Sequence, residues 1–411
     1  MANSSPQNNL PAAESDISVN RLIFFGLITR LVTDTAVQLF FPFLPVIAEG
    51  LRTSSVTAGR LVSLRSAMGL LSPAFGAQAY RRGYRTVMRF GLLLAAVGYV
   101  IVGLSNSVWL AAVGMVMGGL GTFAFVPILQ AYISAKLPFH RRAWGLGTLE
   151  YAWALAGIVG LYLVGLLIEA TSWRVPLFVL SGLMLVAFVG YGRLPSARQA
   201  TEPVTSRTRF SLHSIRTFFE LGPNQLSAYA SLLVVGLNMM AAMNVFISYG
   251  TWLDREYGLS AAQLGTVALI FGLADLSGSV LMSLLGDKIG LRRGVLLGTI
   301  LSVVGYALLP LFNVGMVMVV GGLILARFAF EFTVVGQIAL VSEQAPAHRE
   351  KMMTLAAAAA LLGSSAAGLV GPWVYDQFQA TGLSLVSTAI AAVCLLLIVL
   401  FVREKTADSP V

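Results

Sequence analysis

The amino-acid sequence predicts an all-α membrane protein in which twelve transmembrane helices form two pseudo-symmetric halves of six helices each. Only 11% of its 411 residues are charged, 57% are hydrophobic and the mean hydropathy is +0.81. Polar side chains are therefore too few to cover a water-facing surface of ordinary size. Apolar stretches of about 20 residues, the length that crosses a bilayer as a helix, recur along the chain. A short basic motif also occurs twice, at matching places in the two halves.

Twelve apolar stretches are separated by short polar breaks. Backbone polar groups in lipid must be satisfied within the segment, and the sequence has no series of alternating ten-residue strands, so we expect helices rather than a barrel. The predicted spans are residues 22–48, 57–79, 86–105, 108–135, 143–168, 174–193, 227–250, 261–286, 294–313, 315–340, 353–375 and 381–402.

The net charge of +9 is distributed over the connections between the spans. With the N-terminus in the cytoplasm, the cytoplasmic side carries 20 Lys and Arg, and the outer side carries three, Arg52, Arg174 and Arg255. The remaining four basic residues lie within predicted spans. This asymmetry agrees with the positive-inside rule. It accounts for the charge without nucleic acid, which would need a basic face with interleaved aromatic residues.

A polar connection near the middle of the chain divides the spans six and six. We expect a disordered cytoplasmic N-terminus at residues 1–20, a first half at 21–193, a cytoplasmic linker at 194–226, a second half at 227–402 and a cytoplasmic tail at 403–411. The first 20 residues have no basic segment ahead of an apolar core, so no cleavable signal peptide is expected. A six-helix unit used twice is a plan of secondary transporters, whose site lies between the units.

The repeated basic motif lies between the second and third spans and between the eighth and ninth. It runs from Arg81 to Arg85 and from Lys288 to Arg292, with a basic residue, a glycine and an arginine at the same spacing. Here the chain resembles the major facilitator superfamily, which implies the major facilitator fold and a conformational latch in these loops. The matching residues are Gly76, Arg81, Gly83, Arg85, Asp287, Lys288, Gly290, Arg292 and Arg293. Tyr80 stands where the family's first-half Asp is expected, and Ser283 where its second-half leading Gly is expected.

Two further patterns concern the direction of transport. The fourth span has Gly114 where exporter-rich branches of the family often carry an Arg. The fifth span keeps Gly160 and Gly165 of a glycine run typical of family antiporters, although Leu161 replaces its Pro. The chain is most similar to the twelve-helix sugar and drug efflux permeases of bacteria. This resemblance implies export across a bacterial inner membrane, with both termini in the cytoplasm.

Ionisable residues inside spans are costly unless they are paired or hydrated, so each is a functional candidate. Arg30, Asp34 and Gln38 are spaced by four and share one face of the first helix. In the resembling family this helix lines the central cavity, so Asp34 is a candidate proton carrier or partner of a cationic substrate. The alternative is a permanent ion pair between Arg30 and Asp34 that only neutralises both charges.

The second half offers a matching set. Arg327 and Glu331 are four apart in the tenth span, and the seventh span contains Asn238, Asn244 and Tyr249. The family fold places these helices around the cavity, although such residues also serve as packing and interhelical hydrogen bonds. Asp275 stands alone in the eighth span, so it is either protonated or paired with another helix. It is a second candidate proton carrier, as is Glu331.

Arg65 and Glu150 lie in less central parts of their spans, and interhelical bridging or snorkelling is the favoured interpretation for both. No cofactor or metal is expected, because Cys394 is the single cysteine and the three histidines lie in polar stretches. The carboxylates are scattered singly, which argues against an enzyme, and no phosphate-binding loop is present for an ATP-driven pump.

We therefore expect a secondary active transporter, a monomer in the lipid bilayer, that exports a drug-like or sugar-like compound in exchange for protons. Two alternatives stay open. One is proton-coupled import of a sugar or an organic anion. The other is a sensor that no longer transports, since the first-half signature is incomplete at Tyr80. Charges of both signs in the predicted cavity leave the charge of the substrate undecided.

Overall fold

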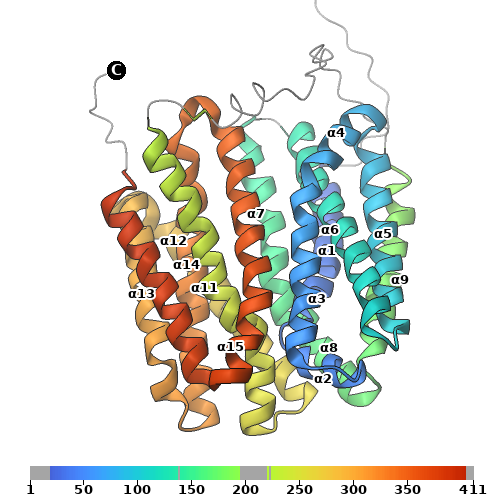
Figure 1. The fold of residues 1–411 in the computed structure, drawn as a ribbon. Coiled ribbons are helices and arrows are strands. Elements are labelled where there is room, and N and C mark those ends of the chain that lie inside the picture. The colour runs from blue at the N-terminus through green and yellow to red at the C-terminus, as the bar shows by residue number, and fades with distance from the viewer. Residues whose placement is uncertain (1–18, 138, 195–219, 222–223, 404–411) are drawn as a thin grey trace, which may run out of the picture.

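The computed structural model describes residues 19–137, 139–194, 220–221 and 224–403, and in this part of the chain every regular element is a helix. The helices form two bundles that stand side by side (Figure 1). The first bundle contains α1 (Val19–Gln38), α2 (Leu44–Gly50), α3 (Ser55–Ala67), α4 (Ser72–Arg82), α5 (Tyr84–Leu104), α6 (Val108–Lys136), α7 (Phe139–Leu155), α8 (Tyr162–Ala170) and α9 (Arg174–Tyr191). The second contains α11 (Gln225–Tyr257), α12 (Ala261–Ile289), α13 (Leu291–Phe312), α14 (Met316–Gln344) and α15 (Arg349–Leu400).

The predicted twelve transmembrane helices are confirmed. Nine helical segments of the described chain are long and apolar enough to cross a membrane. One of them, α15, makes two crossings, because Gln379 has a non-helical backbone (φ 54°) and the helix turns back there (Figure 1). The first two crossings, α1 with α2 and α3 with α4, are divided into shorter helices. Most of the predicted linker, the N-terminus up to residue 18 and most of the tail lie outside the described residues.

Three spans that the sequence predicts as continuous are interrupted. The first breaks between α1 and α2 at residues 39–43, where Pro42 cannot continue a helical hydrogen-bond ladder. The second contains a 3₁₀ turn, Met68–Leu71, just before Pro73. The fifth contains a π-helical turn, Ala156–Leu161, between α7 and α8. Apolar length alone does not predict these breaks, because it measures whether a segment crosses the membrane and not how it bends.

The two basic loops confirm the repeat at atomic level. Gly83 joins α4 to α5 and Gly290 joins α12 to α13, with φ angles of 85° and 87°, a region that favours glycine. Two residues after the glycine, Arg85 donates to the carbonyl oxygen of Leu194 (3.1 Å), beyond the end of α9. Arg292 donates to that of Val402 (2.7 Å), beyond the end of α15. In each half the arginine therefore satisfies carbonyl groups at the end of the last helix.

The two ends of the bundle differ in how the halves meet. We call the end with Gly83 and Gly290 the terminal end, and the end with Gly258 and Gln379 the opposite end (top and bottom of Figure 1). Toward the opposite end, α3 packs on α15 so closely that a Cβ on Gly59 would lie 2.8 Å from the Gly368 carbonyl oxygen.

Other contacts between the halves also use small residues. The Oγ atoms of Ser63 and Ser365 are 3.0 Å apart between α3 and α15. In the contact between α8 and α12, a Cβ on Gly165 would lie 2.6 Å from the Ala261 carbonyl oxygen. At the terminal end, by contrast, most of α4 is exposed, and so are many side chains at the end of α12. The halves are therefore packed together toward the opposite end and are apart at the terminal end.

Within the first half, α5 and α6 pack through glycines, and we expect a larger residue at this contact to destabilise the protein. In Gly98→Ala the added methyl group would lie 2.7 Å from the Gly114 carbonyl oxygen, so the helices must separate. We expect a loss of about 1–3 kcal/mol of stability, as for other overpacked sites. Thermal unfolding of the purified protein, followed by tryptophan fluorescence, measures it. Gly182→Ala in α9, where a Cβ meets no atom within 4 Å, is the control. Equal unfolding temperatures for both variants would contradict the packing.

Candidate functional site

The first half contains a buried charge centre around Arg30 of α1. Its guanidinium donates to both carboxylate oxygens of Glu150 on α7, at 2.6 and 2.9 Å. On the same helix the Arg30 Nε lies 3.3 Å from a carboxylate oxygen of Asp34. Arg30 and Asp34 are 7% and 4% exposed, so both charges are removed from solvent and one arginine serves two carboxylates. Such bidentate pairing is the strongest form of charge-assisted hydrogen bond in proteins.

Glu150 also connects this centre to a third helix. Its carboxylate accepts a hydrogen bond of 2.7 Å from the side-chain amide of Gln130 on α6. Unlike Arg30, its side chain is 55% exposed, so one face of the carboxylate remains open. Gln38, predicted to line the cavity, donates to the carbonyl oxygen of Trp153 (2.9 Å). It therefore holds α1 against α7.

The second half contains a corresponding centre around Arg327 of α14. Its Nε donates to a carboxylate oxygen of Asp275 on α12 (2.8 Å), and a second nitrogen donates to the other oxygen. Asp275 is thus paired with another helix, one of the two options that the sequence left open. Glu331, one turn along α14, accepts a weak hydrogen bond of 3.4 Å from Ser279. The Phe246 ring of α11 covers the guanidinium, with its centroid 4.3 Å away.

The two centres lie at the same depth on either side of the interface. The helices α7 and α12 run antiparallel and are so close that a Cβ on Gly272 would lie 2.7 Å from the Ala154 carbonyl oxygen. Glu150 is one turn from Ala154, and Asp275 is about one turn from Gly272, both in the direction of the terminal end. Glu331 approaches the same helix, because Ser279 of α12 donates to its carboxylate (3.4 Å). The interface between the halves therefore brings the acidic groups of both centres together.

A third buried arginine, Arg65 of α3, has a different environment. It donates to the carbonyl oxygen of Val37 (2.8 Å) and lies over the Phe40 ring, 5.2 Å from its centroid. The backbone of the broken first span and an aromatic face therefore hold this charge. Interhelical bridging, the interpretation that the sequence favours for Arg65, agrees with these contacts.

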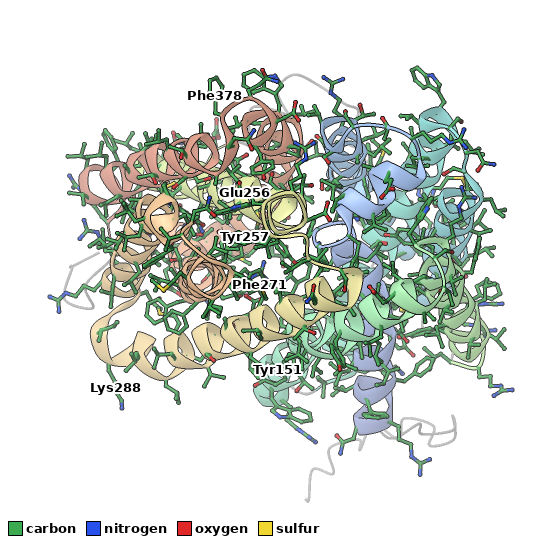
Figure 2. All side chains as sticks on the ribbon, turned by 90° about the horizontal axis from the view of Figure 1, so that it is seen from below. Tyr151, Glu256, Tyr257, Phe271, Lys288 and Phe378 are labelled. Carbon is green, nitrogen blue, oxygen red and sulfur yellow. The ribbon has the colours of Figure 1, made fainter. Side chains whose placement is uncertain are left out.

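The candidate residues of α11 are divided between different neighbours. Asn238 donates to the side-chain oxygen of Gln337 on α14 (3.2 Å). Tyr249 packs edge-on against Phe271 of α12, with ring centroids 5.0 Å apart, and Phe271 points into the second half (Figure 2). Asn244 is fully buried next to Gly371 of α15, and neither atom of its amide group has a hydrogen-bond partner. The structure therefore does not gather these three residues at one point.

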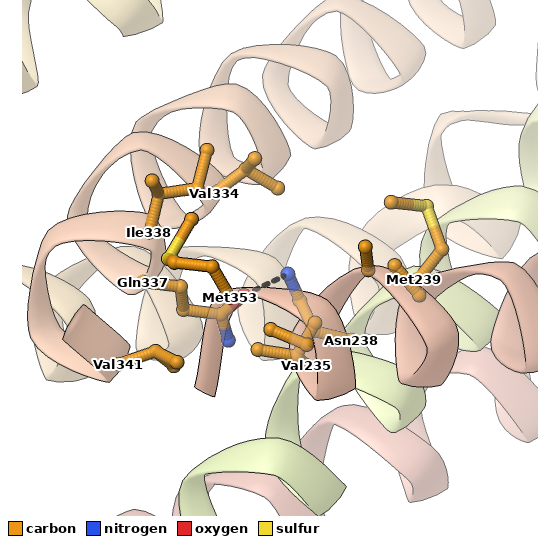
Figure 3. Close-up of a pocket in the computed structure, with 11 residues that line it drawn as sticks. Val235, Asn238, Met239, Val334, Gln337, Ile338, Val341 and Met353 are labelled. Carbon is orange, nitrogen blue, oxygen red and sulfur yellow. Dashed lines mark hydrogen bonds between the residues drawn. The ribbon is translucent and has the colours of Figure 1, made fainter. Parts of the chain in front are cut away.

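A pocket of about 250 Å³ lies between α11, α14 and α15 on the terminal-end side of the second charge centre (Figure 3). Its walls are mostly aliphatic, and the hydrogen-bonded Asn238 and Gln337 supply the polar groups. The Gln337 side-chain nitrogen is buried without a partner. The lining residues are Val235, Asn238, Met239, Val334, Gln337, Ile338, Val341, Met353, Ala356, Ala357 and Ala360.

The predicted latch residues are found in the two basic loops. Gly76, Arg81 and Lys288 are exposed, and Lys288 points away from the bundle (Figure 2). Arg293 is exposed beside the capping residue Arg292. For Asp287 only the backbone is described, within α12. In this structure the capping arginines contact their own half, so a latch between the halves stays a prediction.

Sequence reasoning missed the roles of Glu150, Gln130 and Gln337. The sequence favours bridging or snorkelling for Glu150, because it stands early in the fifth span. It bridges α1 and α7, and it also brings an open carboxylate to the interface. The only available signal was the cost of an acid inside an apolar stretch. Gln130 and Gln337 carry no charge, and an amide in a membrane helix gives no comparable signal.

Comparison with known proteins agrees with this architecture. The uncharacterized MFS-type transporter YceJ of Bacillus subtilis (strain 168) is 26% identical over 367 residues, 89% of this chain and 91% of its own length. The multidrug resistance protein MdtG of Serratia proteamaculans (strain 568) is 25% identical over 299 residues, 70% of this chain and 71% of its own.

Two solved structures share the fold. A bacterial homolog of the human lysosomal transporter Spinster, inward-facing and unoccupied, superimposes with a TM-score of 0.74 at 12% identity, covering 96% of this chain and 100% of that one. The D-xylose-proton symporter gives 0.73 at 16% identity, covering 93% and 98%. The sequence profile of the Major Facilitator Superfamily matches residues 26–248 and 231–411. The chain therefore belongs to the major facilitator superfamily of membrane transporters.

Proposed function

We propose that this transporter works by alternating access and couples the export of a drug-like or sugar-like compound to the entry of protons. The observation that carries the proposal is the pair of charge centres at the interface between the halves. Each centre has one arginine and two carboxylates: Arg30 with Asp34 and Glu150, and Arg327 with Asp275 and Glu331. With all groups ionised, each centre has one negative charge more than its arginine neutralises.

This excess supports a role in proton coupling. An unneutralised carboxylate in a membrane interior is costly, and one bound proton removes the cost. Because the carboxylates of both centres lie near the interface, movement of the halves changes their access to water and to one another. Proton binding then shifts the equilibrium between the conformations, and the conformation in turn changes proton affinity. Asp34, Asp275 and Glu331 are the proposed carriers.

The direction and the orientation belong to the same proposal. The resemblance to MdtG, named a multidrug resistance protein, and the partial antiporter run around Gly160 favour export. The asymmetry of basic residues favours a cytoplasmic location for the terminal end, in a bacterial inner membrane. The halves are apart at that end, so this structure would be the inward-facing state. We further propose that the basic loops act as the latch when the terminal ends come together.

The first test of coupling uses the full-length protein in liposomes loaded with a pH-sensitive dye, with a panel of lipophilic cations, sugars and organic acids. In wild type we expect a substrate to evoke proton movement, and Asp34→Asn and Asp275→Asn to abolish it. Asp376→Asn, which removes an exposed partner of Arg255, is the control. Proton movement that survives in both buried variants would assign these carboxylates to structure. A proton flux in the direction of the substrate would indicate symport instead of export by exchange.

A second test separates stability from coupling at Arg327. Asp275→Asn leaves a buried arginine without its bidentate partner, which should cost about 3–5 kcal/mol of stability. In the double variant Asp275→Asn/Arg327→Met the unpaired arginine is gone, and a bound proton can neutralise the remaining carboxylate of Glu331, so we expect the unfolding temperature to recover while proton movement stays absent. Tryptophan fluorescence on heating and the dye assay measure the two effects. Recovery of both in the double variant would limit the ion pair to a structural role.

A third test concerns the contact between α3 and α15. If alternating access requires the halves to part at the opposite end, joining Ser63 to Ser365 should stop transport. The variant Ser63→Cys/Ser365→Cys is made with Cys394→Ala, which removes the single native cysteine. We expect oxidation to abolish flux and reduction to restore it. The corresponding single-cysteine variants should be insensitive to oxidation. Full flux through the oxidised double variant would contradict separation at this contact.

A further inference from the structure

Three features of the site have no assigned role in substrate binding so far. They are the open face of Glu150, the weakly bonded carboxylate of Glu331, and the pocket between α11, α14 and α15. From their arrangement we infer that the substrate is an amphipathic organic cation. Its charged head binds between Glu150 and Glu331, and its apolar part occupies the pocket. This inference rests on the proposed transport function and specifies its substrate class.

The charge of the head follows from the two glutamates. Arg30 neutralises part of the first centre, but the Glu150 side chain is 55% exposed, and its helix α7 packs on α12 of the other half. Arg327 is engaged by both oxygens of Asp275, which leaves Glu331 with only a 3.4 Å hydrogen bond from Ser279. The two carboxylates come from different halves and lie beside the contact between α7 and α12, Glu150 on α7 and Glu331 hydrogen-bonded to α12. A cation placed between them relieves their repulsion, whereas an anion would add to it.

The pocket continues the same face of α14. Glu331, Val334 and Ile338 follow one another at spacings of three and four residues, so their side chains share one stripe of the helix. Seven residues of helix cover about 10 Å, the length that separates the acidic group from the middle of the pocket. On α11, Phe246 covers Arg327 and Met239 lines the pocket seven residues before it. Both helices therefore run from the second charge centre to the apolar pocket.

The chemistry of the pocket walls agrees with an apolar ligand group. At about 250 Å³ it is close to the lower end of the size range of small-molecule sites, which are mainly apolar with a few polar groups. Its flexible side chains, Met239 and Met353, adapt to different shapes. The unpartnered nitrogen of Gln337 can donate a hydrogen bond to an ether or carbonyl oxygen of the ligand. One or two aromatic rings, or a short alkyl chain, fit this description.

Equilibrium binding to the purified full-length protein in detergent tests the inference. The probe is radiolabelled tetraphenylphosphonium, and the competitors are tetraphenylborate, which has the same shape and the opposite charge, and neutral triphenylphosphine oxide. We expect the cation to bind and both competitors to be at least about tenfold weaker. Glu150→Gln and Glu331→Gln should each weaken cation binding at least about tenfold. Glu343→Gln, on the same helix but in an exposed pair with Arg349, should leave it unchanged.

A pocket variant gives an independent readout. Ala357 is exposed at the pocket wall, so Ala357→Phe fills the pocket with little effect on folding. It should weaken tetraphenylphosphonium binding severalfold and leave the binding of tetramethylammonium, which has no apolar body, unchanged. No binding of the cation, equal binding of the cation, the anion and the neutral compound, or unchanged affinity in both Gln variants would overturn the inference. Proton movement evoked by sugars or organic acids would then still support the proposed transport function, with a different substrate.

Discussion

The structure depends on how arginines are accommodated inside a membrane protein. A guanidinium cannot lose its charge, and in an apolar interior it must find carboxylates or carbonyl oxygens. Arg30 and Arg327 find carboxylates, two for each arginine, and in both centres one of them comes from another helix. These pairs connect α1 to α7 and α14 to α12. Two of these helices, α7 and α12, also meet at the interface between the halves.

Glycine supplies the second constraint, because it sets how closely the helices approach. Where α7 meets α12, the carbonyl oxygen of Ala154 lies where a side chain on Gly272 would be. This contact gives the two charge centres a common depth. Without a hydrophobic driving force between helices in lipid, close packing of small residues is a main source of association. The position of the carboxylates thus follows from contacts made by residues that have no chemistry of their own.

Much of the fold could be predicted from the sequence. The length and spacing of the apolar stretches predicted twelve crossings, and the repeated motif around Gly83 and Gly290 predicted two equivalent halves. The breaks at residues 39–43 and at Ala156–Leu161 were not predicted, because apolar length does not show where a segment bends, although Pro42 marks the first of them in the sequence. For the site, the charges within the spans were identified, but not their partners. Spacing by four finds pairs on one helix, such as Arg30 with Asp34, and cannot show that Glu150 approaches from another helix.

The contacts between the halves also limit how the protein can change by mutation. At Gly59, Gly165 and Gly272 every substitution enlarges the residue, and the neighbouring backbone leaves no room for it. Such changes push the halves apart where they now touch, and they all act in the same direction. No substitution at these positions can draw the halves closer. Random substitutions at these glycines therefore all destabilise the conformation in which the opposite end is closed. Substitutions that stabilise this conformation must occur at other residues.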